Sequence, residues 1–150
     1  YPAYSGKSDE NREFDYSPER QMIPDQGPIP EGTYWINPQE IIYGPNKWSP
    51  KDIVNRALSV YNRLPGVKKR GTFPGGYRSW GAGKVEINPK QINIEGINRG
   101  GFTIHGGETP GSRGCIDLTS QDKSFFEFLE KHRGTQDSIP IFVKYPKSEE

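Results

Sequence analysis

The chain has little cysteine and little histidine: one cysteine and two histidines occur among 150 residues. A single cysteine cannot form a disulfide within the chain, so the thiol is free and the redox compartment cannot be deduced from pairing. Zinc needs three or four ligands, and one cysteine with one nearby histidine falls short of that set. The sequence therefore predicts no internal disulfide, no metal site and no cofactor.

An excess of one charge and long apolar runs are also lacking. Lys and Arg total 20 against 19 Asp and Glu, which gives a net charge of +1. Nucleic-acid binding thus has little electrostatic support, and we interpret the short basic cluster 68–70 as solvated loop charges. No apolar run approaches the ~20 residues of a membrane-spanning helix, so we expect no stable membrane insertion. The chain starts without Met, and we expect any delivery segment to have been removed.

Glycine and proline are abundant, at 18 and 14 residues, and they are spread without a period. This composition is typical of turns between short strands rather than of collagen or disorder. Eight Tyr, seven Phe and three Trp residues supply apolar surface for a core. A chain of this length can bury one such core, so we expect a single domain over residues 1–150.

Strand-like patterns outnumber helical ones. Helices are predicted over 49–64 and over 120–132, the second capped by Thr119 or Ser120 and ended by Gly134. Strands are predicted within 1–8, at 33–36, 84–89, 91–100, 101–105, 115–118 and 138–146. No βαβ alternation is present, so we expect a mainly β (β-rich α+β) fold, a sandwich or barrel of five to seven short strands with two peripheral helices.

The stretch 102–118, FTIHGGETPGSRGCIDL, carries the candidate chemistry. His105 and Cys115 stand ten residues apart across a glycine-rich segment, which a strand–turn–strand layout would bring face to face. A thiol attacks as thiolate and ordinarily titrates near ~8.5, so it needs an adjacent base or positive charge. His105 can be that base and Arg113 that charge. The alternatives are a buried, inert thiol and a nucleophile at Ser112.

Backbone groups around the cysteine add to this hypothesis. The tight turn Arg113-Gly114-Cys115 can point its amides at one spot, as an oxyanion hole requires. Gly106, Gly107 and Gly114 have no Cβ and would let a peptide substrate approach the backbone closely. These features favour acyl transfer through a cysteine nucleophile.

The motifs IHGG and GSRGCIDL resemble the active-site signature of L,D-transpeptidase (YkuD-type) domains. The short His-to-Cys spacing and GCIDL resemble most closely the type VI secretion effectors with an L,D-transpeptidase-like fold, which attack the peptidoglycan of rival bacteria. Companion motifs occur in the same order: a Tyr-Ser-Gly-Lys opening at 4–7, a Gly-Pro-Ile-Pro-x-Gly-x-Tyr turn at 27–34, Ser-Trp-Gly at 79–81 and Arg-x-Gly-Phe at 99–102. The resemblance spans most of residues 1–118.

The resemblance implies that Cys115 is the nucleophile, that His105 activates it, and that the turn Ser112–Gly114 supplies oxyanion donors. Two positions depart from the general pattern. Arg113 stands where the general pattern has a second histidine, and its fixed positive charge would take the place of that histidine in activating the cysteine. Asp117 stands where housekeeping enzymes place an arginine, so a carboxylate-binding cation is missing and ordinary cross-linking is disfavoured.

Substrate contacts are also implied by the resemblance. Trp80, Tyr77 and Tyr34 are candidates for the cleft wall, with a core position as the alternative for each. Asp117 would bind a substrate ammonium or orient the turn. The full predicted substrate-binding set is Gly106, Gly107, Asp117, Trp80, Tyr34 and Arg99.

The implied activity is acyl transfer on the tetrapeptide stem of peptidoglycan, either as an L,D-carboxypeptidase that removes the terminal D-alanine or as a transpeptidase that exchanges D-amino acids. The resemblance further implies a secreted antibacterial toxin that acts in the periplasm of target bacteria, with a secretion apparatus and a cognate immunity protein as partners. We expect a monomer. The alternatives are a housekeeping L,D-transpeptidase that forms 3–3 cross-links and a non-catalytic wall-binding module.

Overall fold

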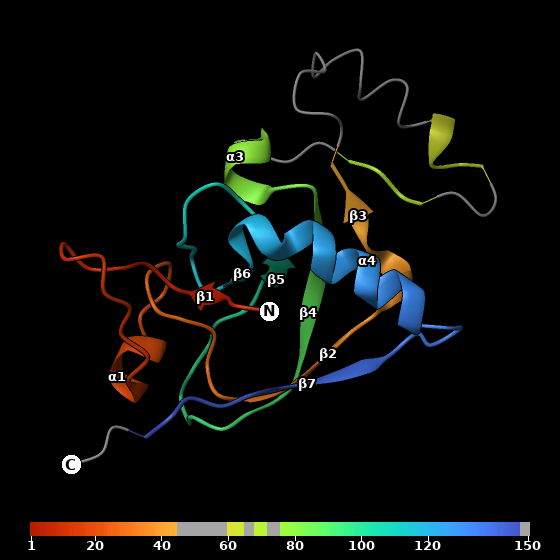
Figure 1. The fold of residues 1–150 in the computed structure, drawn as a ribbon. Helices are drawn as coiled ribbons and strands as arrows, with labels where there is room; N and C mark the ends of the chain where they lie inside the picture. Colours follow the sequence, from red (N-terminus) through yellow and green to blue (C-terminus); the bar gives the residue numbers. More distant parts are fainter. Residues whose placement is uncertain (45–59, 65–67, 72–75, 148–150) are drawn as a thin grey trace.

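A computed structural model of the chain describes residues 1–44, 60–64, 68–71 and 76–147. They form one mixed, curled sheet of seven strands, a half-barrel with one main helix (Figure 1). The strands are β1 (Tyr4–Ser5), β2 (Gly32–Ile36), β3 (Ile42–Tyr43), β4 (Gly83–Ile92), β5 (Phe102–His105), β6 (Ile116–Asp117) and β7 (Ile139–Val143). The helices are α1 (Pro18–Gln21), α3 (Gly76–Trp80) and α4 (Asp122–His132), with 3-10 turns η1 (Pro38–Glu40) and η2 (Thr119–Gln121). The β-rich α+β class is thereby confirmed.

The ten-residue strand β4 organises the sheet. The strand order is β1-β6-β5-β4-β2-β7, and β3 also pairs with β4. The first half of β4 pairs with β5, with Lys84 opposite His105, and its second half pairs with β2. A register shift in β2 between Thr33 and Tyr34 marks a bulge, which increases the local twist. Five of the six neighbouring pairs are antiparallel, and β5–β6 is parallel.

Two strand predictions need correction. The segments 84–89 and 91–100 were expected as separate strands, but β4 runs continuously to Ile92 and passes through Pro89. Residues 93–96 form a bend and a turn instead, in which Gly96 takes a left-handed conformation with φ of 79°, and residues 97–100 have no regular secondary structure. The predicted helix 49–64 lies largely outside the described residues, which resume at Val60.

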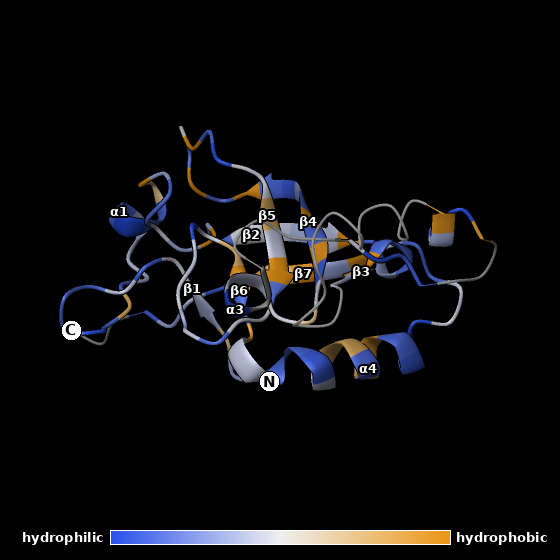
Figure 2. Ribbon diagram, turned by 90° about the horizontal axis from the view of Figure 1, so that it is seen from above, coloured by the Kyte–Doolittle hydropathy of each residue, from blue (hydrophilic) through white to orange (hydrophobic). Residues whose placement is uncertain are grey.

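The core lies between the sheet and α4. Alternate residues of β2, β4 and β5 point inward, as the period of two in a strand requires. Figures 1 and 2 show α4 running along one face of the sheet, with hydrophobic residues interspersed among hydrophilic ones. The buried cluster consists of Ile29, Tyr34, Ile36, Ile41, Val85, Ile87, Phe102, Ile104, Leu118, Phe126 and Leu129.

The start of α4 differs from the prediction. Neither Thr119 nor Ser120 caps it; both lie in the 3-10 turn η2, and the N-cap residue Gln121 makes no side-chain cap bond. Thr119 has a positive φ of 49°, and its amide donates to the Asp117 carboxylate at 2.8 Å. The Asp117 carboxylate thus holds the first residue of η2, the turn that leads into α4. At the other end, Gly134 follows the C-cap with φ of 55°, so that prediction is confirmed.

No helix among the described residues is long and apolar enough to cross a membrane.

The apolar residues of α4 differ in burial. Phe126 is 1% exposed and packs edge-on against Tyr43, with ring centroids 6.3 Å apart, whereas Phe128 is 50% exposed. Phe126→Ala should therefore lower the free energy of unfolding by about 3–5 kcal/mol, the usual cost of emptying a buried phenylalanine site. Urea unfolding followed by circular dichroism measures this change.

Phe128→Ala is the matched control on the same helix. Because half of that side chain is already in water, we expect a loss of less than about 1 kcal/mol. Equal losses for the two variants would show that α4 does not pack on the sheet through Phe126.

Candidate active site

Cys115 lies directly before β6 with its side chain buried, 8% exposed. The parallel pairing of β6 with β5 places Ile116 opposite Ile104. This register brings Cys115 beside Thr103, whose hydroxyl donates to Sγ at 3.3 Å. The Thr103 backbone also bonds to the thiol. Two donors from β5 therefore converge on the sulfur.

His105 ends β5 and is 4% exposed. Its Nδ1 lies against the carbonyl oxygen of Gly106. Because a carbonyl can only accept, Nδ1 carries the proton, and the other ring nitrogen is left for the side-chain hydrogen bond to Cys115. The structure thus brings the predicted thiol and imidazole together.

The protonation of this pair follows from its contacts. Burial by itself raises the pKa of Cys115, but the hydrogen bonds from His105 and Thr103 outweigh it, so the pKa lies below the ordinary value. Burial likewise lowers the pKa of His105, yet the bonds to Cys115 and the Gly106 carbonyl raise it above the usual 6.5. The two shifts together favour a thiolate–imidazolium pair.

Arg113 does not take the part predicted for it. Its side chain is exposed, and the groups that lower the pKa of Cys115 are His105 and Thr103. The Arg113 carbonyl instead accepts a hydrogen bond from Arg99 at 3.2 Å. A hydroxyl and an imidazole, rather than a fixed cation, stabilise the thiolate.

Trp80 stands next to the pair. Its ring centroid lies 4.8 Å from that of His105, and the Nζ of Lys84 lies 5.0 Å from the centroid of the Trp80 ring. Lys84 belongs to β4 and is paired in register with His105. Of the aromatic residues predicted for the cleft wall, Trp80 is therefore beside the site. The side chain of Tyr77 lies outside the described residues.

The loop that carries Cys115 is anchored by the N-terminal strand. Ser112 Oγ donates to the Cys115 carbonyl at 2.7 Å and accepts from the Gly6 amide at 3.3 Å, while the Ser112 amide donates to the Gly6 carbonyl at 2.9 Å. Ser5 Oγ donates to the Gly114 carbonyl at 3.1 Å. These bonds commit the Ser112 hydroxyl to holding the loop, which argues against Ser112 as a nucleophile.

The same bonds narrow the choice of oxyanion donors. The Ser112 amide faces Gly6, and the Gly114 amide is directed at Ser112 Oγ at 3.4 Å. Of the amides predicted as oxyanion donors, those of Arg113 and Cys115 are left as candidates.

The glycines predicted to admit substrate are required by internal packing instead. A Cβ on Gly106 would lie 2.3 Å from Cγ of Asp122, and one on Gly107 would lie 3.1 Å from the Arg78 carbonyl oxygen. Gly114, with φ of 118°, would clash with Arg99 Nη2 at 2.6 Å. The space beside each glycine is filled by the protein, so the prediction that they contact substrate is not supported by their surroundings.

Asp117 makes the contacts expected for orienting the turn, which was one of its two predicted roles. It is 1% exposed, and its oxygens accept from the amides of Thr119 at 2.8 Å and Gly111 at 3.1 Å. Burial nevertheless raises the pKa of Asp117. Since it is opposite His105 in the sheet, its charge also helps to raise the pKa of the imidazole. A carboxylate buried in this way does not face a substrate ammonium.

Arg99 is occupied by the main chain. Its guanidinium donates to the carbonyls of Gln21, Pro28, Gly27 and Arg113, the last three at 2.8, 2.9 and 3.2 Å. It thereby ties the proline-rich turn 27–30 to the cysteine loop. These contacts account for Arg99 without a substrate.

Tyr34 is a core residue, so its prediction as a cleft wall is wrong. It is 0% exposed, its hydroxyl donates to the Pro30 carbonyl at 2.7 Å, and its ring packs edge-on against Phe102 at 6.3 Å. Burial raises the pKa of Tyr34 to about 12, so the phenol stays neutral.

Sequence reasoning missed three residues that shape the site: Thr103, Ser5 and Asp122. Thr103 could have been found, because it precedes His105 by two residues and so shares its face of β5. Asp122 accepts from the Ala82 amide at 2.7 Å and is buried against Gly81 and Gly106. That long-range contact leaves no local signal in the sequence.

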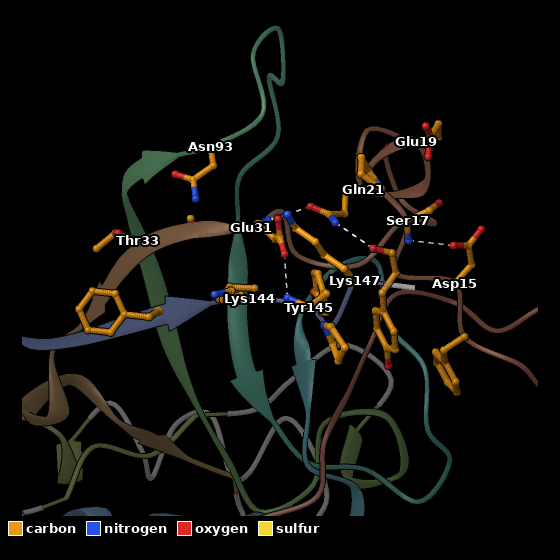
Figure 3. A pocket seen from close by; sticks show the side chains of 17 residues that line it. Asp15, Ser17, Glu19, Gln21, Glu31, Thr33, Asn93, Lys144, Tyr145 and Lys147 are labelled. Atoms are coloured by element: carbon orange, nitrogen blue, oxygen red, sulfur yellow. Dashed lines mark hydrogen bonds between the residues drawn. The ribbon is translucent and has the colours of Figure 1, made fainter. Parts of the chain in front are cut away.

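The hollows formed by the described residues include a small pocket and a larger groove. The pocket, of about 320 Å³, is lined by Glu40, Ile42, Lys69, Lys84, Glu86, Gly101 and Thr103, and Thr103 is the residue that connects it to the thiol. A larger groove of about 1280 Å³ lies between the segment around α1 and the end of the chain after β7 (Figure 3). Its Glu31 carboxylate accepts from the Tyr145 amide at 2.7 Å, and none of the predicted site residues lines it. Of these two, the smaller pocket shares a residue, Thr103, with the candidate site.

Within the described part of the chain, no group of three or more His, Cys, Asp or Glu side chains is arranged to hold a metal ion.

The curled β-rich sheet, with a cysteine after a glycine turn and a histidine at the end of the neighbouring strand, defines the L,D-transpeptidase-like class of proteins. The family model of the Tlde1 domain matches residues 1–139, and the chain belongs to this family of type VI secretion L,D-transpeptidase-like effector domains. No curated protein matches the chain.

The Thr103 hydroxyl gives a direct test of the thiolate. Thr103→Val removes a donor to Sγ, which destabilises the charged form and raises the pKa of Cys115. A hydrogen bond to a charged group contributes ~1.5–3 kcal/mol, so the midpoint of the pH profile for iodoacetamide alkylation should rise by about one to two pH units. Mass spectrometry of the alkylated protein measures the rate at each pH.

Thr103→Ser is the control, because it retains the hydroxyl and should leave the midpoint within a few tenths of a unit. An unchanged midpoint in Thr103→Val would show that the threonine does not stabilise the thiolate.

Proposed function

We propose that this chain is a cysteine acyltransferase that acts on the tetrapeptide stems of peptidoglycan. It removes the terminal D-alanine as an L,D-carboxypeptidase or exchanges it for another D-amino acid. The observation that carries the proposal is the buried Cys115–His105 pair, in which the pKa of the thiol is lowered and that of the imidazole is raised. Membership of the Tlde1 domain family supports the same chemistry.

The first half of the reaction uses the pair as it stands. The Cys115 thiolate attacks the carbonyl carbon of the third residue, at the L-centre of diaminopimelate, and a C–S bond forms as the carbonyl oxygen takes the negative charge. The His105 imidazolium then gives its proton to the nitrogen of D-alanine as the C–N bond breaks. The products are a thioester on Cys115 and a free D-alanine.

The second half reverses these steps with a new nucleophile. His105, now neutral, takes a proton from water or from the amine of a D-amino acid as that group attacks the thioester. The C–S bond breaks and the Cys115 thiolate forms again, stabilised by the hydrogen bond from the Thr103 hydroxyl. The backbone amides of Arg113 and Cys115 are our candidate donors to the oxyanion in both halves.

Water or a small amine is the acceptor that the turn favours. Asp117 occupies the position of the arginine of housekeeping enzymes, and its buried carboxylate holds the turn rather than a substrate carboxylate. This arrangement supports loss of donor stems over formation of 3–3 cross-links. Removal of donor stems would weaken the wall, which is consistent with delivery as a toxin to the periplasm of other bacteria and with a cognate immunity protein in the producer.

Muropeptide analysis tests the activity. Purified protein incubated with disaccharide tetrapeptides should convert them to tripeptides, and added D-methionine should appear in exchanged tetrapeptides, both resolved by mass spectrometry. Cys115→Ala should abolish both products, and His105→Ala should lower their rates at least 100-fold, because general base catalysis contributes about 10²–10⁴.

The chain offers a matched control in its second histidine. His132 is exposed at the end of α4 and contacts Phe128, so His132→Ala should leave the rates unchanged. An increase in 3–3 dimers without tripeptide would overturn the proposal in favour of a housekeeping transpeptidase. Unaltered muropeptides with a thiol inert to iodoacetamide would favour a non-catalytic module.

A further inference from the structure

The pocket of about 320 Å³ is lined by a direct neighbour of each member of the reactive pair: Thr103, which is bonded to Cys115, and Lys84, which is opposite His105 in the sheet. Thr103 belongs to both: it lines the pocket, and its hydroxyl touches Cys115 Sγ at 3.3 Å. Lys84, on another wall, lies 5.0 Å from the Trp80 ring that packs against His105. A group bound in this pocket would therefore lie one side chain away from the thiol.

Both signs of charge line this pocket. Lys84 and Glu86 are two residues apart on β4 and project to the same face of the sheet, with Glu86 opposite Thr103 in register. Glu40 of η1 and Lys69 also line the pocket. Together with Lys84 and Glu86 they surround it with two carboxylates and two ammonium groups.

This lining selects for a ligand that carries both charges. An anion would be attracted by the two lysines and repelled by the two glutamates, and a cation the reverse, so a singly charged group gains little net energy. A group with an ammonium and a carboxylate on the same carbon can pair with both sets at once.

We propose that this pocket binds the zwitterionic head of an amino acid, an α-ammonium together with an α-carboxylate. The inference rests on the proposed function, for which it supplies a specificity subsite. Two sources share this chemistry: the distal amino-carboxylate end of the diaminopimelate side chain in the donor stem, and a free D-amino acid that acts as acceptor.

Binding can be measured without turnover in the Cys115→Ala variant. Calorimetry with free diaminopimelate and with D-methionine should detect at least one of them, whereas N-acetyl-D-methionine, which lacks the ammonium, should bind at least fivefold more weakly. Glu40→Gln and Lys69→Met in this background should each weaken zwitterion binding at least fivefold. Neither side chain belongs to the reacting pair, and both are exposed.

Kinetics of the active protein distinguish the two sources. If the pocket holds the donor side chain, Lys69→Met should raise KM for the diaminopimelate stem about tenfold and leave KM for a stem with L-lysine, which lacks the distal carboxylate, unchanged. If it holds the acceptor, the same variant should raise KM for D-methionine in exchange and leave hydrolysis unaffected.

Lys131→Met and Glu127→Gln, exposed on α4, are the matched controls and should change none of these values. Absence of zwitterion binding to Cys115→Ala overturns the pocket assignment even if the stems are cleaved. So does zwitterion binding by the Glu40→Gln and Lys69→Met variants that is as tight as that of Cys115→Ala alone. Binding in the pocket without any cleavage of stems would instead count against the proposed function and leave the pocket in place.

Discussion

The parallel pairing of β5 with β6 is the constraint on which the site depends. It is the one parallel pair among the neighbouring strands of the sheet, and its register sets Ile116 opposite Ile104 and Asp117 opposite His105. A slip of one residue would turn the side chains of β6 to the other face and separate the thiol from the imidazole. Since β6 has two residues, its own backbone bonds are too few to hold that register.

The register is held instead by polar contacts from distant parts of the chain. Ser5 bonds the Gly114 carbonyl, Arg99 bonds the Arg113 carbonyl, and Asp117 bonds amides on both sides of itself. These bonds satisfy backbone groups of a loop that has few apolar side chains to pack. Two of the companion motifs of this chain, which contain Ser5 and Arg99, thus help to fix the loop in front of β6.

The sequence predicted what is local and failed where contacts are long-range. The Cys115–His105 pair could be inferred because spacing and residue type suffice for it, and α4 could be inferred from its period and from Gly134. Tyr34 was predicted to line the cleft, with the core as the alternative, because the sequence pattern of a strand does not show whether an aromatic residue faces a cleft or the core. Gly106 was predicted to contact substrate because the sequence does not show what lies beside it. The space is filled by Asp122, which is 16 positions away in the sequence, and nothing local marks that contact.

The burial of the reactive pair explains why so much of the chain is devoted to positioning it. Burial alone would raise the pKa of the thiol and lower that of the imidazole, which would leave both neutral and the sulfur unreactive. The bonds from Thr103 and the Gly106 carbonyl, together with the bond between Cys115 and His105, reverse both shifts. Hydrogen bonds depend steeply on distance and angle, so this reversal holds only while the loop stays in place. Reactivity at Cys115 is therefore a property of the folded network, and the N-terminal strand contributes to it from more than 100 residues away.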